Sequence, residues 1–207
     1  DDTITRVSDS ALSAFDDYLM GNDEPNMVWG MSGDDQLNGA GGNDTMFGGN
    51  GRDTLTGGTG DDSLLGGSGA DTFIGGAGND SLFGESGTQD EVIYESLPGR
   101  VFVNLLAQNA GKFATASETN PEFIDRVNTI EFVTGTAGAD TLLGDANANR
   151  LRGLSGADSI EGGEGRDSLF GGGDSDTLNG QDGNDSILGE QGNDYLIGGR
   201  GKDTIDG

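Results

Sequence analysis

Aspartate recurs at every ninth position through much of this sequence, with glycine around it each time. Residues 48–83 read GGNGRDTLT, GGTGDDSLL, GGSGADTFI and GGAGNDSLF, four nine-residue units without an insertion. Each unit has glycine at its first, second and fourth places, aspartate at its sixth and a large apolar residue at its eighth. Carboxylates and the exposed carbonyls of glycine-rich turns are oxygen ligands that Ca²⁺ accepts. The spacing therefore predicts calcium sites.

The same frame extends beyond these four units. It begins in weakened form at Leu12, breaks after Phe83 because Gln89 occupies the expected aspartate position, and resumes at Gly135. A row this regular is not expected of an acidic surface that is merely solvated. The candidate metal ligands at the sixth places are Asp17, Asn26, Asp35, Asp44, Asp53, Asp62, Asp71, Asp80, Asp140, Asn149, Asp158, Asp167, Asp176, Asp185, Asp194 and Asp203.

A period of nine matches neither an amphipathic helix nor a long alternating strand. Each unit has three consecutive residues of strand character, such as Thr54 to Thr56, and otherwise turn-forming residues. The pattern predicts a coil that stacks on itself, with two units per turn and two parallel sheets. Eighth-place residues such as Leu55 and Phe73 should point inward, and sixth-place aspartates should stack along the two edges. Neighbouring strands lie about 4.8 Å apart, so the stacked carboxylates repel unless a cation lies between them.

The predicted fold is all-β: a parallel β-roll solenoid in two blocks joined by a β-rich connecting segment. Residues 1–11 would be the end of a preceding strand or a cap. Residues 12–92 would form the first block, residues 93–134 the connecting segment and residues 135–207 the second block.

The region between the blocks changes character. Residues 91–94, 101–105 and 124–133 are rich in β-forming residues, and we expect strands there. Residues 107–121 are expected to form a polar loop. At the start of the chain, residues 3–7 are expected to form a short strand.

The charge balance excludes several classes of function. The 207 residues include 37 acidic and 10 basic ones, which gives a net charge of −27 and argues against nucleic acid or an anionic membrane surface as a partner. Histidine and cysteine are absent, which excludes disulfides, the usual zinc and haem sites, and Ser–His or Cys–His nucleophiles. We therefore expect no enzymatic activity. No run of about 20 apolar residues, the length needed to span a bilayer, occurs in the sequence.

Only one residue in nine points into the predicted roll, which is little apolar burial against the conformational entropy of nine ordered residues. We therefore expect folding to depend on bound cations. Each block has eight sixth-place residues, and pairing those two units apart gives six sites per block. Twelve Ca²⁺ ions would change the net charge from −27 to −3, and we expect about ten to twelve bound ions.

The nonapeptide units resemble the RTX repeats of bacterial proteins exported by type I secretion, such as haemolysin and adenylate cyclase toxins and serralysin-like proteases. The connecting segment is similar as well, in Val101–Leu105 and Asn128–Thr136. The resemblance implies a module that folds on binding extracellular calcium and supports the secretion and folding of a larger exported protein. It also implies a location outside or on the surface of a Gram-negative bacterium, with the type I secretion apparatus as a partner of the parent protein.

Two other functions are compatible with such a roll. An adhesive or surface-layer module would use it as a spacer or as a ligand-binding element. An ice-binding solenoid would need a regular row of threonine or asparagine on one face. The seventh places are only partly regular, as Gln36, Thr45 and Ser63 illustrate, so this last alternative is the least favoured.

The resemblance also implies a ligand set, in which an ion lies between one loop and the loop two units further on. The first loop would supply the carbonyls of its second and fourth places and its sixth-place side chain. The later loop would supply the carbonyls of its first and third places and its sixth-place side chain. One such set in this sequence is Gly49, Gly51, Asp53, Gly66, Ser68 and Asp71.

The carbonyl ligands that the resemblance implies fall on four places of the unit. First places are Gly30, Gly39, Gly48, Gly57, Gly66, Gly75, Gly153, Gly162, Gly171, Gly180, Gly189 and Gly198. Second places are Gly49, Gly58, Gly163, Gly172 and Gln181. Third places are Ser32, Gly41, Asn50, Thr59, Ser68, Ala77, Ser155, Glu164, Gly173, Asp182, Gln191 and Arg200. Fourth places are Gly33, Gly42, Gly51, Gly60, Gly138, Asn147, Gly156, Gly165, Asp174 and Gly183.

Some units depart from the pattern at the fourth place. Asn147 and Asp174 replace glycine there, and both residue types tolerate positive φ better than other residues with a side chain. Phe15 and Glu24 occupy the same place and should make the first two sites of the chain the weakest. Asparagine at a sixth place supplies an oxygen without a charge, so affinity should fall there.

Overall fold

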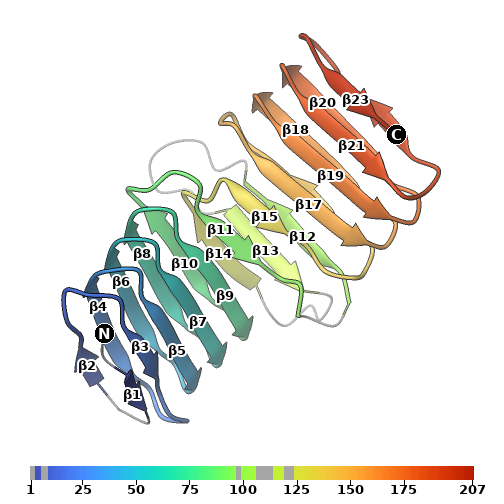
Figure 1. Ribbon diagram of the computed structural model, residues 1–207. Coiled ribbons are helices and arrows are strands. Elements are labelled where there is room, and N and C mark those ends of the chain that lie inside the picture. Colours follow the sequence, from blue (N-terminus) through green and yellow to red (C-terminus); the bar gives the residue numbers. More distant parts are fainter. Residues whose placement is uncertain (1–2, 6–8, 97–98, 106–113, 119–123) are drawn as a thin grey trace. The chain divides into compact units, whose positions relative to one another are not determined.

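The computed structural model describes residues 3–5, 9–96, 99–105, 114–118 and 124–207. These residues form 23 strands and no helix, so the all-β prediction is confirmed. Accordingly, nothing in the described part of the chain is a helix that could cross a membrane. The chain divides into two compact units (Figure 1), one made of Asp1–Val92 and Glu122–Ile130 and the other of Ile93–Pro121 and Glu131–Gly207.

Two parallel sheets make up the first unit. One contains, in spatial order, β1 (Thr3–Thr5), β3 (Tyr18–Met20), β5 (Gln36–Gly41), β7 (Thr54–Thr59), β9 (Thr72–Ala77) and β11 (Glu91–Ile93). The other contains β2 (Asp9–Ala11), β4 (Met27–Ser32), β6 (Thr45–Asn50), β8 (Ser63–Ser68), β10 (Ser81–Glu85) and β14 (Ile124–Asn128).

The second unit is also built of two sheets, which are parallel except for one antiparallel pair of strands. One sheet contains β15 (Phe132–Thr134), β17 (Arg150–Ser155), β19 (Ser168–Gly173), β21 (Ser186–Glu190) and β23 (Thr204–Asp206). The other contains β13 (Ala114–Glu118), β12 (Val101–Asn104), β16 (Thr141–Leu143), β18 (Ser159–Gly165), β20 (Thr177–Gly183) and β22 (Tyr195–Ile197).

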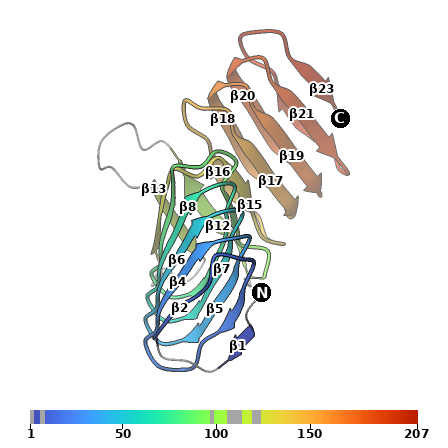
Figure 2. The ribbon, with the colours of Figure 1, turned by 60° about the vertical axis from the view of Figure 1, so that its left-hand side comes forward.

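The register confirms two nonapeptides per turn. Leu37 pairs with Leu55 and Leu55 with Phe73, so paired strands are two nonapeptides apart in the sequence. Outside the connecting region, where β12, β13 and β14 lie in one sheet, consecutive strands alternate between the two sheets, and tight loops join them at both edges (Figure 2). The chain is therefore a parallel β-roll, as predicted.

The regular strands are longer than the three residues expected from strand-forming side chains. β7 runs for six residues, from Thr54 through both glycines to Thr59. The pairing with β9 continues through Gly58 and Gly76, although both have positive φ. Glycine carries no side-chain signal of a strand, which is why the prediction stopped too early.

Eighth-place side chains form the core of each unit. Leu55, Leu64, Phe73 and Leu82 are fully buried, as are their counterparts in the second unit from Leu142 to Ile187, which confirms the inward direction predicted for them. Ninth-place side chains lie on the outer faces of the sheets. There the stacked rings of Trp29 and Phe47 are 5.8 Å apart, in line with the register of β4 and β6.

The connecting region has strands in all three segments that the sequence indicates, and one strand that the sequence does not indicate. β11, β12, β14 and β15 lie in or next to the predicted segments. β13 lies in residues 107–121, where a polar loop was expected, and pairs antiparallel with β12. The loop prediction is therefore wrong at 114–118, and residues 107–113 and 119–121 lie outside the described residues. Pairing to a neighbouring strand, and not an apolar pattern, makes this segment extended.

Candidate calcium sites

The sixth-place residues stack into ladders along the loops of each unit. The Asp17 N–H donates to Asp35 Oδ1 at 2.8 Å. In the same way, the Asp35 N–H donates to Asp53 Oδ1 and the Asp53 N–H donates to Asp71 Oδ1, both at 2.9 Å. We call each such residue a rung. Sixteen rungs were predicted, and fourteen of them are at most 4% exposed; Asp194 and Asp203 are more open. The structure thus brings the predicted side chains into line, with most of them bound to the backbone of the rung two units earlier.

The second carboxylate oxygen of most rungs has no such partner. Burying a charged oxygen without a donor is costly, and nearly all buried polar atoms in proteins are hydrogen-bonded. A row of exceptions at one structural position therefore points to a ligand. The buried Oδ2 atoms without a hydrogen bond belong to Asp35, Asp44, Asp53, Asp62, Asp71, Asp80, Asp158, Asp167, Asp176 and Asp185.

These oxygens point into a space kept free by the first-place glycine. A β-carbon added to Gly48 would collide with Asp53 Oδ2 and would lie 2.7 Å from the carbonyl oxygen of Gly66. Gly48 does not have positive φ. Its lack of a side chain is what allows a carboxylate of one loop and a first-place carbonyl of the loop two units on to face the same point.

The other implied carbonyls are also placed between consecutive loops. A β-carbon at Gly67 or Gly69 would collide with the carbonyl oxygen of Gly49 or Gly51, so these second- and fourth-place carbonyls point at the loop two units on. The carbonyl of Ser68 accepts from Gly51 N–H at 2.9 Å and keeps its second lone pair. The donors that the family pattern implies are thus directed at the interval between two loops.

The donor chemistry fits Ca²⁺. Among the described residues, no group of three or more acidic, histidine or cysteine side chains gathers where it could hold a metal. An ion between two rungs must therefore draw most of its ligands from backbone carbonyls. Ca²⁺ takes six to eight oxygen ligands and accepts both backbone carbonyls and carboxylates.

The environment disfavours the charged form of the rungs. Desolvation by burial raises the pKa of Asp53 to about 7. The N–H of Asp35 lowers this pKa, whereas the charges of Asp71 and Asp35 raise it. Burial is also the largest cause of the raised pKa at five other rungs. The pKa rises to about 7 in Asp62, Asp158 and Asp167 and to about 6 in Asp71 and Asp80. A nearby cation would offset this cost.

Four rungs differ, because an N–H of their own loop donates to a side-chain oxygen of the rung. Ser13 N–H donates to Asp17 Oδ2 at 2.9 Å, and Thr136 N–H donates to Asp140 Oδ2 at 2.6 Å. The corresponding pairs in the next units are Asn22 with Asn26 and Asp145 with Asn149. We call these four capped loops, and we call those whose second-place residue has positive φ open loops. The capped loops are the first two nonapeptides of each predicted block.

A turn made by the second-place side chain explains the capped loops. Ser13 Oγ accepts from Phe15 N–H at 3.3 Å, and Asn22 Oδ1 accepts from Glu24 N–H at 2.8 Å. This side-chain turn leaves the fourth place without positive φ, so a bulky residue is accepted there. The sequence signal of a capped loop is Ser, Thr, Asn or Asp at the second place, which the nine-residue frame alone does not reveal.

Two of the four fourth-place exceptions, Asp174 and Asn147, illustrate this division. Asp174 lies in an open loop and adopts φ 74°, as expected of it. Asn147 lies in a capped loop and does not adopt positive φ. Its N–H instead donates to Asp145 Oδ1 at 2.8 Å.

Two rungs were not predicted at all. Asp71 N–H donates to Asp90 Oδ1 at 2.8 Å, and Asp80 N–H donates to Asp125 Oδ1 at 2.9 Å. Asp90 lies one residue after the framed position of Gln89. Asp125 is followed by Arg126 and buried Val127, so its only signal is an aspartate two residues before an inward apolar residue.

Comparison with known families agrees with this geometry. A family model, the RTX calcium-binding nonapeptide repeat, matches residues 13–46, 20–55, 47–82, 128–160, 143–178 and 170–205. The matches include all sixteen predicted rungs and leave out residues 83–127, where Asp90 and Asp125 lie. No individual curated protein matches the chain.

Proposed function

Since the chain belongs to the family of RTX calcium-binding nonapeptide repeats, we propose that it folds on binding extracellular calcium and thereby supports the secretion and folding of a larger exported protein. Bound Ca²⁺ would supply the positive charge that the stacked carboxylates lack. Asp53, Asp71 and their equivalents would hold it with the carbonyls between them.

One observation carries this proposal. Ten buried carboxylate oxygens have no hydrogen bond, and they occupy equivalent positions beside a first-place glycine in both units. A fold that needed no ligand would satisfy these atoms internally, as the capped loops do. The family makes calcium the expected ligand.

The link to export follows from charge and concentration. A chain with a net charge of −27 and buried carboxylates repels itself when no cation is bound. Extracellular calcium modules have dissociation constants of about 10⁻⁴–10⁻³ M, and cytosolic calcium is far lower. We infer that the chain remains unfolded inside the cell, is threaded outward, and folds on arrival.

Circular dichroism of the chain with chelator and with increasing CaCl₂ tests this proposal. We expect a β-sheet signal that is absent in chelator and appears at submillimolar to millimolar calcium. The same concentration of MgCl₂ should not replace calcium, because Mg²⁺ demands six ligands at shorter distances and dehydrates reluctantly. A full β signal in chelator would refute calcium-dependent folding, and a folding midpoint below micromolar calcium would refute the link to export.

A further inference from the structure

The ladders of the first unit continue past the last regular nonapeptide. The unit that begins at Gly84 has one residue too many, and Gln89 takes it up with φ 77°. Asp90 is thereby placed in the ladder, is fully buried, and binds Asp71 N–H through Oδ1. The N···O distance of 2.8 Å equals that between Asp44 N and Asp62 Oδ1, two rungs of open loops.

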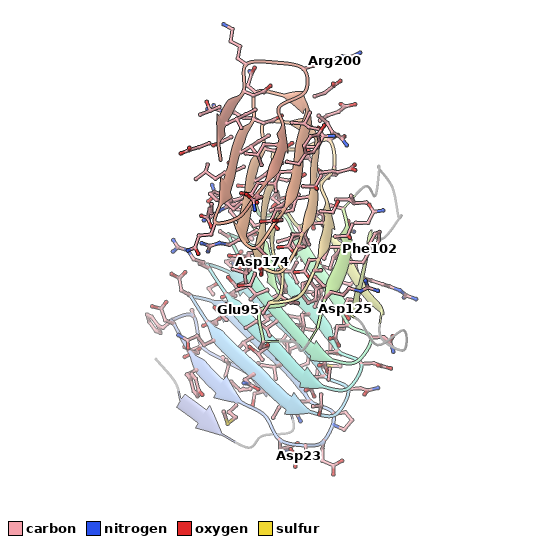
Figure 3. The ribbon with its side chains drawn as sticks, turned by 90° about the vertical axis from the view of Figure 1, so that its right-hand side faces the viewer. Asp23, Glu95, Phe102, Asp125, Asp174 and Arg200 are labelled. Carbon is pink, nitrogen blue, oxygen red and sulfur yellow. The ribbon has the colours of Figure 1, made fainter. Side chains whose placement is uncertain are left out.

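Asp125 belongs to the other ladder, although it follows its partner Asp80 by 45 residues in the sequence. β14 pairs with β10 so that Leu82 lies opposite Val127, which places Asp125 directly beside Asp80. Asp125 is 2% exposed. It is the second residue of β14 in the first unit (Figure 3).

Asp71 and Asp80, the rungs that pair with Asp90 and Asp125, each have a carboxylate oxygen that could bind a cation. Asp71 and Asp80 are at most 1% exposed, and the Oδ2 of each has no hydrogen bond. Both belong to open loops, because Gly67 and Gly76 at their second places have positive φ. Each is therefore a half-site whose second carboxylate would come from outside the nonapeptide pattern.

The loop of Asp90 also has the cradle seen in regular units. A β-carbon at Gly84 would collide with Asp90 Oδ2 and with the carbonyl oxygen of Thr129. In the regular loop, Asp53 Oδ2 and a first-place carbonyl meet in the same way at Gly48. Glu85, at the second place, adopts φ 67°, which is the conformation of an open loop.

We propose that Asp90 and Asp125 are additional ligands for a divalent cation, Asp90 in a site with Asp71 and Asp125 in a site with Asp80. Ca²⁺ binding in the first unit would then extend beyond the last nonapeptide, into residues that the family model does not match. This inference rests on the proposed function, because it takes Ca²⁺ as the ion of the regular rungs.

Native mass spectrometry of the full chain, at the lowest calcium concentration that saturates the unmodified protein, tests the proposal. Asp90→Asn and Asp125→Asn should each bind at least one ion fewer than the unmodified chain. The positive control is Asp167→Asn, a regular rung of the second unit. The negative control is Asp23→Asn, which removes the same charge from an exposed loop residue (Figure 3).

The outcomes separate the two proposals. If Asp167→Asn loses ions while Asp90→Asn and Asp125→Asn match Asp23→Asn, the additional sites are refuted and the proposed function stands. If Asp167→Asn also keeps its ions, the proposed function itself fails. Deletion of Gln89 provides a test that does not depend on a loss of bound ions. It restores a nine-residue unit and should leave the number of bound ions unchanged. A gain of an ion would show that Asp90 binds none in the natural spacing.

Discussion

Glycine serves two different purposes in one nonapeptide. Gly49 adopts φ 115°, a backbone conformation that residues with a side chain rarely adopt. Gly48 has no such conformation, and its hydrogen atom is needed because Asp53 Oδ2 and the Gly66 carbonyl lie where a β-carbon would be. A substitution at Gly48 therefore acts on the candidate ion site and not on the backbone.

We predict that Gly48→Ala raises the calcium concentration at the midpoint of folding about tenfold, which corresponds to about 1.4 kcal/mol. The added methyl group would displace a carboxylate and a carbonyl from the same site. Calcium titration followed by circular dichroism measures the midpoint. Gly173→Ala is the matched control, because a β-carbon there lies 3.8 Å from its nearest neighbours and Gly173 lacks positive φ. Equal midpoints for the two variants would contradict the role given to Gly48.

Capped loops give each ladder a first rung whose oxygens are satisfied without an ion. Asp140 receives hydrogen bonds from Thr136 N–H and from Val101 N–H, both at 2.6 Å. Asp158, the next rung, has one oxygen bound to Asp140 N–H and the other without a hydrogen bond. The loops can thus be divided into those whose rung keeps a buried oxygen without a hydrogen bond and those that supply that hydrogen bond themselves.

This division predicts different consequences for the same substitution. Asp140→Asn should keep the number of bound ions and lower the free energy of unfolding by about 1–3 kcal/mol, because an amide cannot accept both N–H groups. Asp158→Asn should lower the number of bound ions. Native mass spectrometry and urea unfolding at constant calcium measure the two quantities. Loss of ions from Asp140→Asn would show that capped loops bind calcium too.

The regular elements could be predicted from the sequence because their period is short and unbroken. Leu55 and Asp53 follow from the frame alone, and both lie where the frame puts them. Asp90 could not be predicted in this way, since one inserted residue shifts it out of the frame. Asp125 rejoins the roll after a segment of no fixed period, and only the pairing of β10 with β14 shows its place.

Across the whole molecule, the buried carboxyl groups couple folding to pH. Each rung with a raised pKa binds a proton more tightly in the metal-free roll than in the unfolded chain. Stability of the metal-free roll therefore rises as pH falls from about 7, the pKa of Asp53 and Asp158, toward the ordinary value of 3.8. Calcium binding has the opposite dependence, because protons and Ca²⁺ compete for the same oxygens.

We predict that the calcium-free chain gains β-sheet signal as the pH is lowered from 7.5 to about 4.5, where protonation relieves the repulsion between rungs. Over the same interval the calcium midpoint of folding should rise. Circular dichroism of protein freed of calcium by dialysis measures the first effect, and calcium titrations at each pH measure the second. A calcium midpoint that stays constant across this interval would contradict the raised pKa values.

Because each turn consists of two nonapeptides, the number of turns in the roll can change in evolution by whole turns. Asp53 and Asp71 occupy the same place in consecutive turns of one ladder, and each residue of a regular turn has a counterpart two units later. Excision of residues 54–71 would join Asp53 to Thr72 and leave every remaining side chain among neighbours of the same kind. Duplication of such a segment would add a turn just as simply. Recombination could therefore change the number of cations that the protein binds without changing how the side chains of its core pack.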